Sequence, residues 1–378
     1  MKTLLLFSFL PLISLAQTLI YRTHPLQSYQ IPAMSFSSNS TPMMNEHGDI
    51  AIRLVSVEGR VNNGIWLTSA DGNDRGQLIY ESADFRMLGD PAINDHKQVI
   101  FSQFDYGISD GIFSYRPGQG VQLAVDPELY PYTEAFAGLS LDASGQIYFR
   151  HAQYNEIRSL NRFVDINTKS QELIEGEGNI SFLFVPHQKN THQVIKVRYG
   201  EQFDYREELP DRLLLAKNLG EFQVIAEDTD ADGTSPYLSF DNTPKVNSLG
   251  QVVFIAKLRD GQRAVFFYDG EVIHQVAKEG ADVGSIDFFA ACLNAQGVIA
   301  FRGQNQQGQP VLYVYKNGSL QSFLTAGQIL PSDLGPAQVV SFTGSAQIND
   351  QNQLVIQVNL AHPESQTNLG QGLYAFDL

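Results

Sequence analysis

Hydrophobic and polar positions alternate along most of this chain in short runs, and the runs recur in a fixed order. Each copy has an apolar residue, then Asn or Asp, a short polar turn that ends in Gly or Asn, and a β-rich run. Six copies are readable, and they begin at Met44, Ile93, Leu141, Val246, Leu293 and Ile348. A repeat of this length that carries several short strands is typical of propeller blades.

The spacing of the copies predicts one more, diverged copy. Successive copies lie 49, 48, 105, 47 and 55 residues apart, so one interval is about twice the others. Within that interval, residues 179–226 contain four strand-like runs without the Asn and Gly signature. Six visible copies and one hidden copy predict seven blades.

Each copy predicts four antiparallel strands. Asp269-Gly270 and Asn317-Gly318 are read as type I′ turns between two of them. The last copy lacks its fourth strand, and residues 18–22 precede the first copy without a partner. We therefore predict an all-β fold, a seven-bladed β-propeller with four antiparallel strands per blade and a ring closed by the N-terminal strand. A solenoid of β-hairpins is the alternative, but it would need capping repeats at its ends.

The first residues predict export. Lys2 precedes an apolar run, and the small residues Ser14 and Ala16 occupy the positions that a signal peptidase reads. We predict a signal peptide at residues 1–16, a single propeller domain at 17–378, and a secreted or periplasmic protein without membrane insertion. The only cysteine, Cys292, lies in an apolar run, which excludes an intrachain disulfide and predicts a raised thiol pKa.

The charge distribution sets one region apart. The net charge of −16 argues against nucleic-acid binding, because phosphate contacts need a basic surface. Residues 146–217 nevertheless hold 10 Lys or Arg against 10 Asp or Glu, whereas the rest of the chain has 15 against 31. An anionic partner would therefore meet the least repulsion in this segment.

Most of the conspicuous side chains are interpreted as structural. We read the recurring Asn and Gly residues as turn residues that tolerate left-handed backbone. They are Asn45, Asn94, Asn247, Asn294 and Asn349, with Gly48, Gly145, Gly250 and Gly297. Aromatic residues at equivalent strand positions, among them Trp66, Phe254, Phe301 and Tyr374, are predicted to pack in the core.

Two patterns suggest metal ligands. His187 and His192 flank a predicted turn and form either a metal pair or ordinary loop histidines. Asp228, Asp230 and Asp232 alternate along D-T-D-A-D-G, which can wrap oxygen ligands around Ca²⁺, but Ser239 stands where the closing acidic ligand belongs. The alternative is an acidic connector between blades. We expect no required cofactor and treat calcium as a possible structural ion.

The most informative cluster lies in the third and fourth blades. Arg150 and His151 leave one strand, and Arg198 and Tyr199 leave a strand that we place at the corresponding position of the next blade. A polar loop with Tyr205 and Arg206 follows, and then Arg212 opens a further strand. Guanidinium groups pair with carboxylate or sulfate in a forked geometry, so this rim could bind an anion. The alternative is structural, because Arg53 and Arg302 end the same strand in other copies.

The order of His151, Tyr199 and Arg212 resembles that in the seven-bladed propeller polysaccharide lyases, such as the bacterial ulvan lyases. In that family a His ends a strand of one blade, a Tyr follows in the next blade, and an Arg comes a short strand later. The family also uses a His about twenty residues earlier, where this chain has Tyr130 and Tyr132. The resemblance covers the whole propeller and rests on these three residues.

The resemblance implies a lyase that cleaves a uronic-acid-containing polysaccharide, sulfated or unsulfated, by β-elimination. Tyr199, His151 and Arg212 would be catalytic. Substrate binding would fall to Arg150, Arg198, Tyr205, Arg206 and Tyr132. The alternative is a non-catalytic cell-envelope propeller that binds glycans or proteins, because a fold alone does not fix function. We expect a monomer, and the hypothesis for its partner is an anionic polysaccharide.

Overall fold

The structure is a computed structural model of the whole chain, and part of the chain is described. The described ranges are 17–24, 27–28, 34–36, 40–56, 62–73, 76–82, 86–105, 108–130, 133–153, 159–163, 171–174, 180–199, 210–217, 221–228, 234–241 and 244–378. The predicted signal peptide lies outside them. Among the described residues, no helix is long and apolar enough to cross a membrane.

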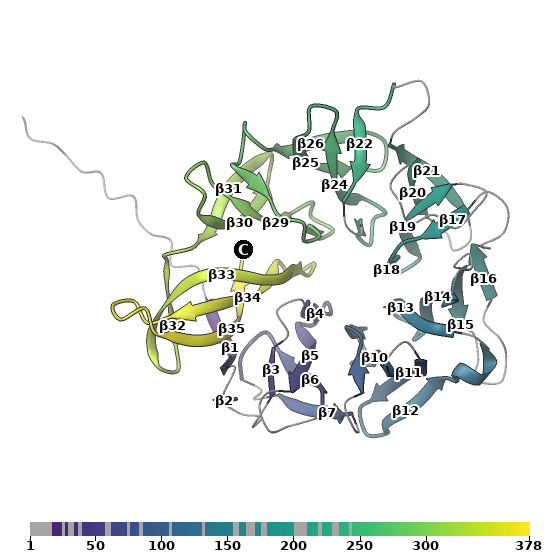
Figure 1. Cartoon of the computed structure of the whole chain (residues 1–378), viewed down its shortest axis with the longest axis horizontal. Helices are drawn as coiled ribbons and strands as arrows, with labels where there is room; N and C mark the ends of the chain where they lie inside the picture. The colour runs from purple at the N-terminus through teal and green to yellow at the C-terminus, as the bar shows by residue number, and fades with distance from the viewer. Residues whose placement is uncertain are drawn as a thin grey trace, which may run out of the picture.

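The described strands pair into seven antiparallel sheets, arranged around a ring as in a β-propeller (Figure 1). Sheet 1 contains β3 (Met34–Phe36), β4 (Met43–Met44), β5 (Asp49–Ser56), β6 (Gly64–Ser69) and β7 (Gln77–Glu81). Sheet 2 contains β8 (Met87–Leu88), β9 (Ala92–Ile93), β10 (Val99–Asp105), β11 (Ile108–Arg116) and β12 (Gly120–Val125). Sheet 3 contains β13 (Thr133–Leu141), β14 (Ile147–Gln153), β15 (Ser159–Phe163) and β16 (Gln171–Ile174). A short 3₁₀ turn, Pro127–Leu129, leads into it.

The second half of the chain continues the ring. Sheet 4 contains β17 (Ile180–Leu183), β18 (His187–Lys189), β19 (His192–Tyr199), β20 (Asp211–Ala216) and β21 (Phe222–Glu227). Sheet 5 contains β22 (Tyr237–Phe240), β23 (Lys245–Val246), β24 (Val252–Leu258), β25 (Arg263–Tyr268) and β26 (Ile273–Lys278). Sheet 6 contains β27 (Ser285–Ile286), β28 (Cys292–Leu293), β29 (Ile299–Gln304), β30 (Pro310–Lys316) and β31 (Ser319–Thr325). Sheet 4 is the one predicted within residues 179–226.

Sheet 7 joins the two ends of the chain. It contains β32 (Ile329–Ser332), β33 (Gly335–Ile348), β34 (Gln353–Ala361) and β35 (Asn368–Asp377), together with β1 (Gln17–His24) and β2 (Gln27–Ser28). β1 pairs antiparallel with β35, with Thr18 opposite Ala375 and Arg22 opposite Gly372. This pairing confirms the predicted closure by the N-terminal strand, and it covers an edge that would otherwise be exposed.

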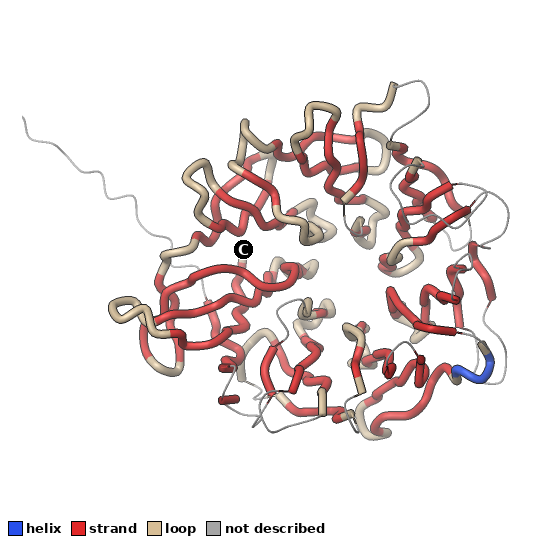
Figure 2. Tube along the Cα trace, viewed as in Figure 1, coloured by secondary structure: helices blue, strands red, loops and turns tan. Residues whose placement is uncertain are grey.

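The hydrophobic core lies between neighbouring sheets, where strand residues interdigitate. One cluster joins sheets 4 and 5, and others join sheets 5 and 6 and sheets 6 and 7. Trp66, Phe254, Phe301 and Tyr374 are buried, which confirms their predicted packing role. Figure 2 shows that almost all regular structure around the ring is strand. Burial of these aromatic faces between sheets stabilises the ring.

The turn after each innermost strand explains the recurring Asn and Gly residues. Gly48, Gly250 and Gly297 adopt left-handed backbone, as predicted, but the Asn residues three positions earlier do not. The Oδ1 atom of Asn294 instead accepts hydrogen bonds from the backbone N–H groups of Gln296 and Val298. The interpretation of Asn as a left-handed residue was therefore wrong, because its side chain holds the turn from within.

The two predicted type I′ turns differ. Asn317 and Gly318 both have positive φ, as this turn type requires. Between β25 and β26 only Gly270 is left-handed. Asp269 instead accepts backbone N–H groups of Glu271 and Val272 through Oδ1, so a longer carboxylate-capped loop replaces the predicted turn.

Candidate functional site

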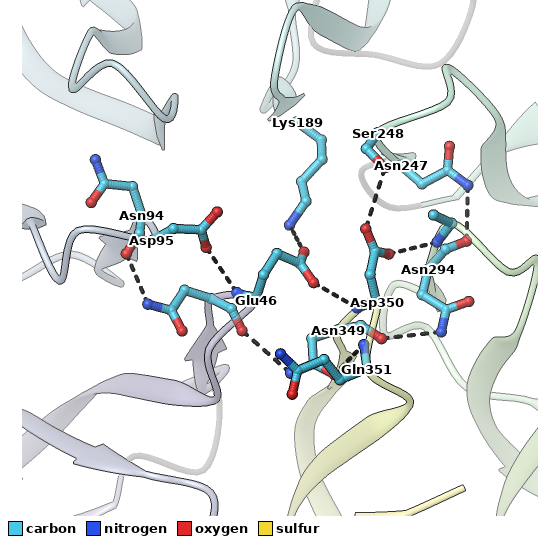
Figure 3. A network of polar contacts seen from close by, with 12 residues as sticks. Glu46, Asn94, Asp95, Lys189, Asn247, Ser248, Asn294, Asn349, Asp350 and Gln351 are labelled. Carbon is cyan, nitrogen blue, oxygen red and sulfur yellow. Dashed lines mark hydrogen bonds and ion pairs between the residues drawn. The ribbon is translucent and has the colours of Figure 1, made fainter.

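The turns after the innermost strands lie together at one end of the central channel, which we call the turn face. Side-chain amides connect them from sheet to sheet (Figure 3). Asn45 Nδ2 donates to the carbonyl oxygen of Asn94 at 2.9 Å, and Asn247 Nδ2 donates to that of Asn294 at 2.8 Å. Asn94, Asn294 and Asn349 continue the pattern. The recurring Asn thus links neighbouring sheets, a role that a single repeat does not reveal.

This chain of amides is interrupted at sheets 3 and 4. Sheet 3 has Asp142 at the Asn position, and a carboxylate cannot donate onward. Sheet 4 has a two-residue turn, Asn190 and Thr191, between β18 and β19. The register confirms the shorter turn, because Lys189 pairs with His192 and Gln188 with Gln193. Sheet 4 therefore departs from the repeat at the central channel.

Three carboxylates and one lysine close the turn face. Lys189 of sheet 4 forms an ion pair with Glu46 of sheet 1, on the other side of the channel (Figure 3). Glu46 also accepts from the backbone N–H of Asp350 at 2.6 Å and donates its own N–H to Asp95 at 2.9 Å. The turn face is therefore acidic and bridged by side chains.

Basic side chains on the second strand of several sheets reach the next sheet. Arg53 Nη1 donates to the carbonyl oxygen of Leu88 at 2.8 Å, and Arg150 Nη1 donates to that of Leu183 at 3.0 Å. Lys196 Nζ donates to the carbonyl oxygen of Phe240 at 3.0 Å, and Arg302 contacts that of Gly344 in the same way. Arg150 therefore makes the inter-sheet contact that its counterparts Arg53 and Arg302 make.

The position assigned to Arg198 was wrong. Lys196, two residues earlier, makes the contact that corresponds to the one made by Arg150. The short turn of sheet 4 changes the register of β19, and the sequence comparison did not account for it. Arg198 lies two residues beyond Lys196, near the C-terminal end of β19.

Arg198 belongs to a buried ionic cluster. Its Nε and Nη2 atoms donate to the two carboxylate oxygens of Asp211 at 2.7 and 3.0 Å. Lys196 Nζ lies 3.3 Å from Asp211 and above the ring of Phe184. Burial lowers the pKa of Lys196, against the effect of Asp211. The guanidinium of Arg198 is 3% exposed, so this pair is part of the fold.

Asp228 completes the cluster from the end of β21. Its Oδ1 atom accepts the backbone N–H of Asp211 at 2.6 Å. Burial and the neighbouring Asp211 raise its pKa to about 7, although the hydrogen bond acts in the opposite direction. Asp230 and Asp232 lie outside the described residues, so the calcium site stays a prediction. The Asp228 carboxylate itself faces strand β20 of sheet 4, where it accepts the Asp211 N–H.

Arg212 is more accessible than Arg198. Its Nε and Nη2 atoms donate to Glu227 at 2.8 and 3.2 Å, and the two side chains are 34% and 32% exposed. Arg212 pairs with Val197 near the end of β19, opposite the turn face. We call this end of the ring the far face.

The remaining predicted residues are placed in part. His151 lies in β14 and Tyr199 ends β19, so the backbone brings both to the far face near Arg212. The positions of Tyr132, Tyr205 and Arg206 fall outside the described residues. The strands thus bring the three predicted catalytic positions to one end of neighbouring sheets.

A central cavity lies between the two faces. Its volume is about 430 Å³, and residues of six sheets line it, among them Met43, Asp90, Phe104, Phe136, His187, Lys245 and Ser345. A smaller cavity toward the turn face shares Met43, His187 and Lys245. Asp90 Oδ1 lies 3.2 Å from Arg53 Nε and accepts from Ser40 at 3.0 Å. We call the larger space the axial cavity.

Lys245 and His187 are the basic groups of this cavity on the side of sheets 4 and 5. Burial lowers the pKa of Lys245 to about 8, although Cys292 and Asp90 act in the opposite direction. Burial, with Lys245 and Lys189 nearby, lowers the pKa of His187 well below 6.5. His187 Nδ1 accepts the backbone N–H of Val246 at 3.2 Å. The neutral ring therefore carries its proton on Nε2.

The sequence singled out His187 only as half of a metal pair with His192. In the structure His187 lines the axial cavity, whereas the ring of His192 lies against Gly250. No group of three metal-ligating side chains occurs among the described residues. Sequence reasoning missed Lys245, which lies two residues before a turn Asn, although the other copies have uncharged residues there: Met43, Ala92, Ser140, Cys292 and Gln347. Cys292 is buried, and burial raises its thiol pKa to about 12, as predicted.

Known structures share this architecture. The β-propeller domain of the trilobed protease from Pyrococcus furiosus superposes with a TM-score of 0.59 at 13% identity, over 91% of this chain and 95% of that domain. The polysaccharide lyase Uly1 gives 0.55 at 9% identity, over 93% and 91%. An oligogalacturonate lyase from Vibrio parahaemolyticus gives 0.53 at 11%, over 97% of each chain. The fold is a β-propeller. At these identities the likeness extends to the fold alone.

Comparison by sequence identifies fewer similar proteins than comparison by structure. Residues 209–378 match a family described as "Family of unknown function (DUF7453)". No curated protein matches the chain. The Pyrococcus propeller is described as having an open velcro topology, whereas β1 and β35 close the ring here.

Proposed function

We propose that this protein is a secreted or periplasmic propeller, with one blade per sheet, that binds an acidic polysaccharide on the far face of sheets 3 and 4. The observation that carries the proposal is the accessible Arg212, whose side chain is 34% exposed and pairs with Glu227 at the surface of the far face. Its partner Glu227 is equally exposed, so a carboxylate or sulfate of a glycan can compete for it.

The charge distribution supports the same surface. The segment 146–217 is locally neutral in a chain of net charge −16. The turn face carries Glu46, Asp95 and Asp350, which repel an anionic chain at that end of the ring. Electrostatic repulsion elsewhere would concentrate an acidic polymer at Arg212, and salt would weaken its binding.

A lyase reaction is the second candidate, and the strand ends favour it. The backbone positions of His151, Tyr199 and Arg212 lie toward the far-face ends of β14, β19 and β20. Arg212 would neutralise the uronate carboxylate and so acidify the proton at C5. Tyr199 or His151 would remove that proton, the bond from C4 to the glycosidic oxygen would break, and the leaving oxygen would be protonated.

One experiment separates the two candidates. The purified protein is incubated with a panel of uronic-acid polysaccharides, and binding is measured beside the ultraviolet absorbance of an unsaturated product. Turnover that is lost in Tyr199→Phe and His151→Ala, with folding and binding retained, supports the lyase. Binding without turnover that is lost in Arg212→Gln supports the binding protein. Failure to bind any polyuronate would overturn both.

A further inference from the structure

The axial cavity contains two hydrogen-bond donors that the fold leaves unused. The described residues give the Lys245 ammonium neither a hydrogen bond nor an ion pair, although it is partly buried. The Nδ1 atom of His187 is occupied by Val246, so the Nε2 proton of the neutral ring is free to donate. The two residues come from neighbouring sheets and line the same space.

Two donors without an acceptor point to an anion. Withdrawing an ammonium group from water without a counterion is costly, and a bound carboxylate offsets that cost. The carboxylate of Asp90, in the same cavity, is already held by Arg53 and Ser40. Glu46, at the turn face, is held by Lys189. Asp90 acts on Lys245 through its charge, but among the described residues neither acid forms a hydrogen bond or ion pair with the Lys245 ammonium.

The departure of sheet 4 from the repeat also supports a binding site beside His187. His187 belongs to the one sheet that replaces the Asn turn with a two-residue turn. Gln193, in that sheet, is fully buried, and its side-chain amide has no hydrogen-bond partner among the described residues. A local departure from an otherwise regular repeat, with an unsatisfied amide, is expected at functional sites.

The rest of the cavity suits a ligand with hydroxyl groups. Its volume of about 430 Å³ falls within the range of small-molecule sites. Ser102 and Ser345 line it, Asp90 offers a carboxylate to hydroxyl donors, and Phe104 and Phe136 offer apolar surface. Such a mixture of aromatic and polar groups fits a sugar ring.

We propose that the axial cavity binds a small sugar acid, with its carboxylate on Lys245 and His187 and its hydroxyl groups toward Asp90 and the serines. This site is separate from the far-face surface around Arg212. It binds a monomeric acid and does not depend on whether a polymer binds at the far face.

Calorimetric titration with D-glucuronate tests the proposal, with D-glucose and propionate as partial ligands. We expect glucuronate to bind, glucose to bind at least tenfold more weakly because it lacks the carboxylate, and propionate to bind more weakly because it lacks the hydroxyl groups. No binding of glucuronate overturns the proposal. Equal binding of glucose removes the role of the carboxylate, and equal binding of propionate removes that of the sugar.

Variants of Lys245 and His187 test whether these two residues bind the carboxylate. Lys245→Met keeps the side-chain length and removes the charge, and we expect at least a tenfold loss of glucuronate affinity. His187→Asn keeps an acceptor for the Val246 N–H and removes the Nε2 donor, so we expect a smaller loss with the fold intact. Lys278→Met, on outer strand β26 of the same sheet as Lys245, is the charge-matched control. Native affinity in Lys245→Met would refute the assignment.

Discussion

Arg22 of β1 and Asp333 between β32 and β33 form a two-pronged ion pair, although 311 positions separate them in the chain. The Nε and Nη2 atoms of Arg22 lie 2.7 and 2.9 Å from the carboxylate oxygens of Asp333. A third guanidinium nitrogen donates to the carbonyl oxygen of Leu369 at 2.8 Å. The pair fixes the first strand against the last sheet, so the chain ends cannot separate without losing it.

Removing the closing strand should destabilise the whole ring. Deletion of residues 18–22 removes Ile20 and Tyr21 from the core and exposes the edge of β35. Loss of a buried aromatic side chain alone costs about 3–5 kcal/mol. We expect a lower denaturation midpoint in a single transition, measured by circular dichroism.

Asp333→Asn is the companion variant. It removes the negative charge that pairs with the buried Arg22 guanidinium, so we expect a smaller loss of about 3 kcal/mol. A deletion variant that melts at the native temperature would show that β1 does not contribute to closure.

The amide link between turns should contribute more stability than the turn itself. Asn294 accepts two backbone N–H groups and donates to Asn349 and Asn352. At about 1 kcal/mol for each hydrogen bond, Asn294→Ala should cost about 3–4 kcal/mol in urea unfolding. The cost should be largest for bonds that are buried between sheets.

Asn305 provides a matched control. It caps an exposed hairpin in the same way, with Oδ1 accepting from Gln307 and Gln309, but it reaches no other sheet. Its hydrogen bonds are exposed and each contributes less than a buried one, so Asn305→Ala should cost only about 1–2 kcal/mol. Equal losses in the two variants would mean that the inter-sheet bonds contribute nothing.

The repeat and its spacing were enough to predict the propeller arrangement, the hidden sheet within 179–226 and the closing strand. These features depend on local strand and turn patterns, which a single sequence displays. The double interval between Leu141 and Val246 was informative because every sheet needs about the same length of chain to cross from axis to rim. The β1 prediction followed from the count of strands alone.

The candidate site positions were harder to predict, for a physical reason. Arg150 and Arg198 look equivalent in sequence, but the two-residue turn of sheet 4 makes Lys196 the counterpart of Arg150. Lys245 and His187 become neighbours only when innermost strands of different sheets meet on the axis. No pattern within one repeat carries that information, and the pairing of Arg198 with Asp211 was equally hidden.

Asp228 should make stability depend on pH. Its pKa is about 7 in the folded protein and near 4 when exposed, so the folded state binds the proton more tightly. The stability it contributes is full below about pH 4 and is lost as pH rises through 7. Asp228→Asn keeps an acceptor for the Asp211 N–H and cannot titrate. We expect this variant to lose stability less steeply than the native protein between pH 4 and 7, in unfolding curves measured across that range.

Asp260→Asn is the control for this measurement. Asp260 is an exposed carboxylate whose pKa is lowered by its hydrogen bond with Lys278, so it titrates below that window. It changes the net charge by the same amount and should retain the native slope between pH 4 and 7. A slope unchanged in Asp228→Asn would show that Asp228 ionises normally in the fold.

Freeing Arg212 should strengthen the binding of an acidic polysaccharide. In the native protein an anionic glycan must displace Glu227, which holds both Nε and Nη2. Glu227→Gln removes that competing charge. Because both side chains of the pair are about one-third exposed, the variant should lose less than about 1 kcal/mol of stability. We expect a severalfold higher affinity for polyuronate at low salt and a steeper loss of affinity as salt rises.

Glu221→Gln is the control for this measurement. Glu221 is an exposed acid just before the same strand β21, so its substitution makes the same change in net charge and should leave affinity nearly unchanged. If the two variants bind polyuronate equally, the gain comes from net charge alone and Arg212 is not the contact; if Glu227→Gln alone gains affinity, the far face binds its ligand through that guanidinium.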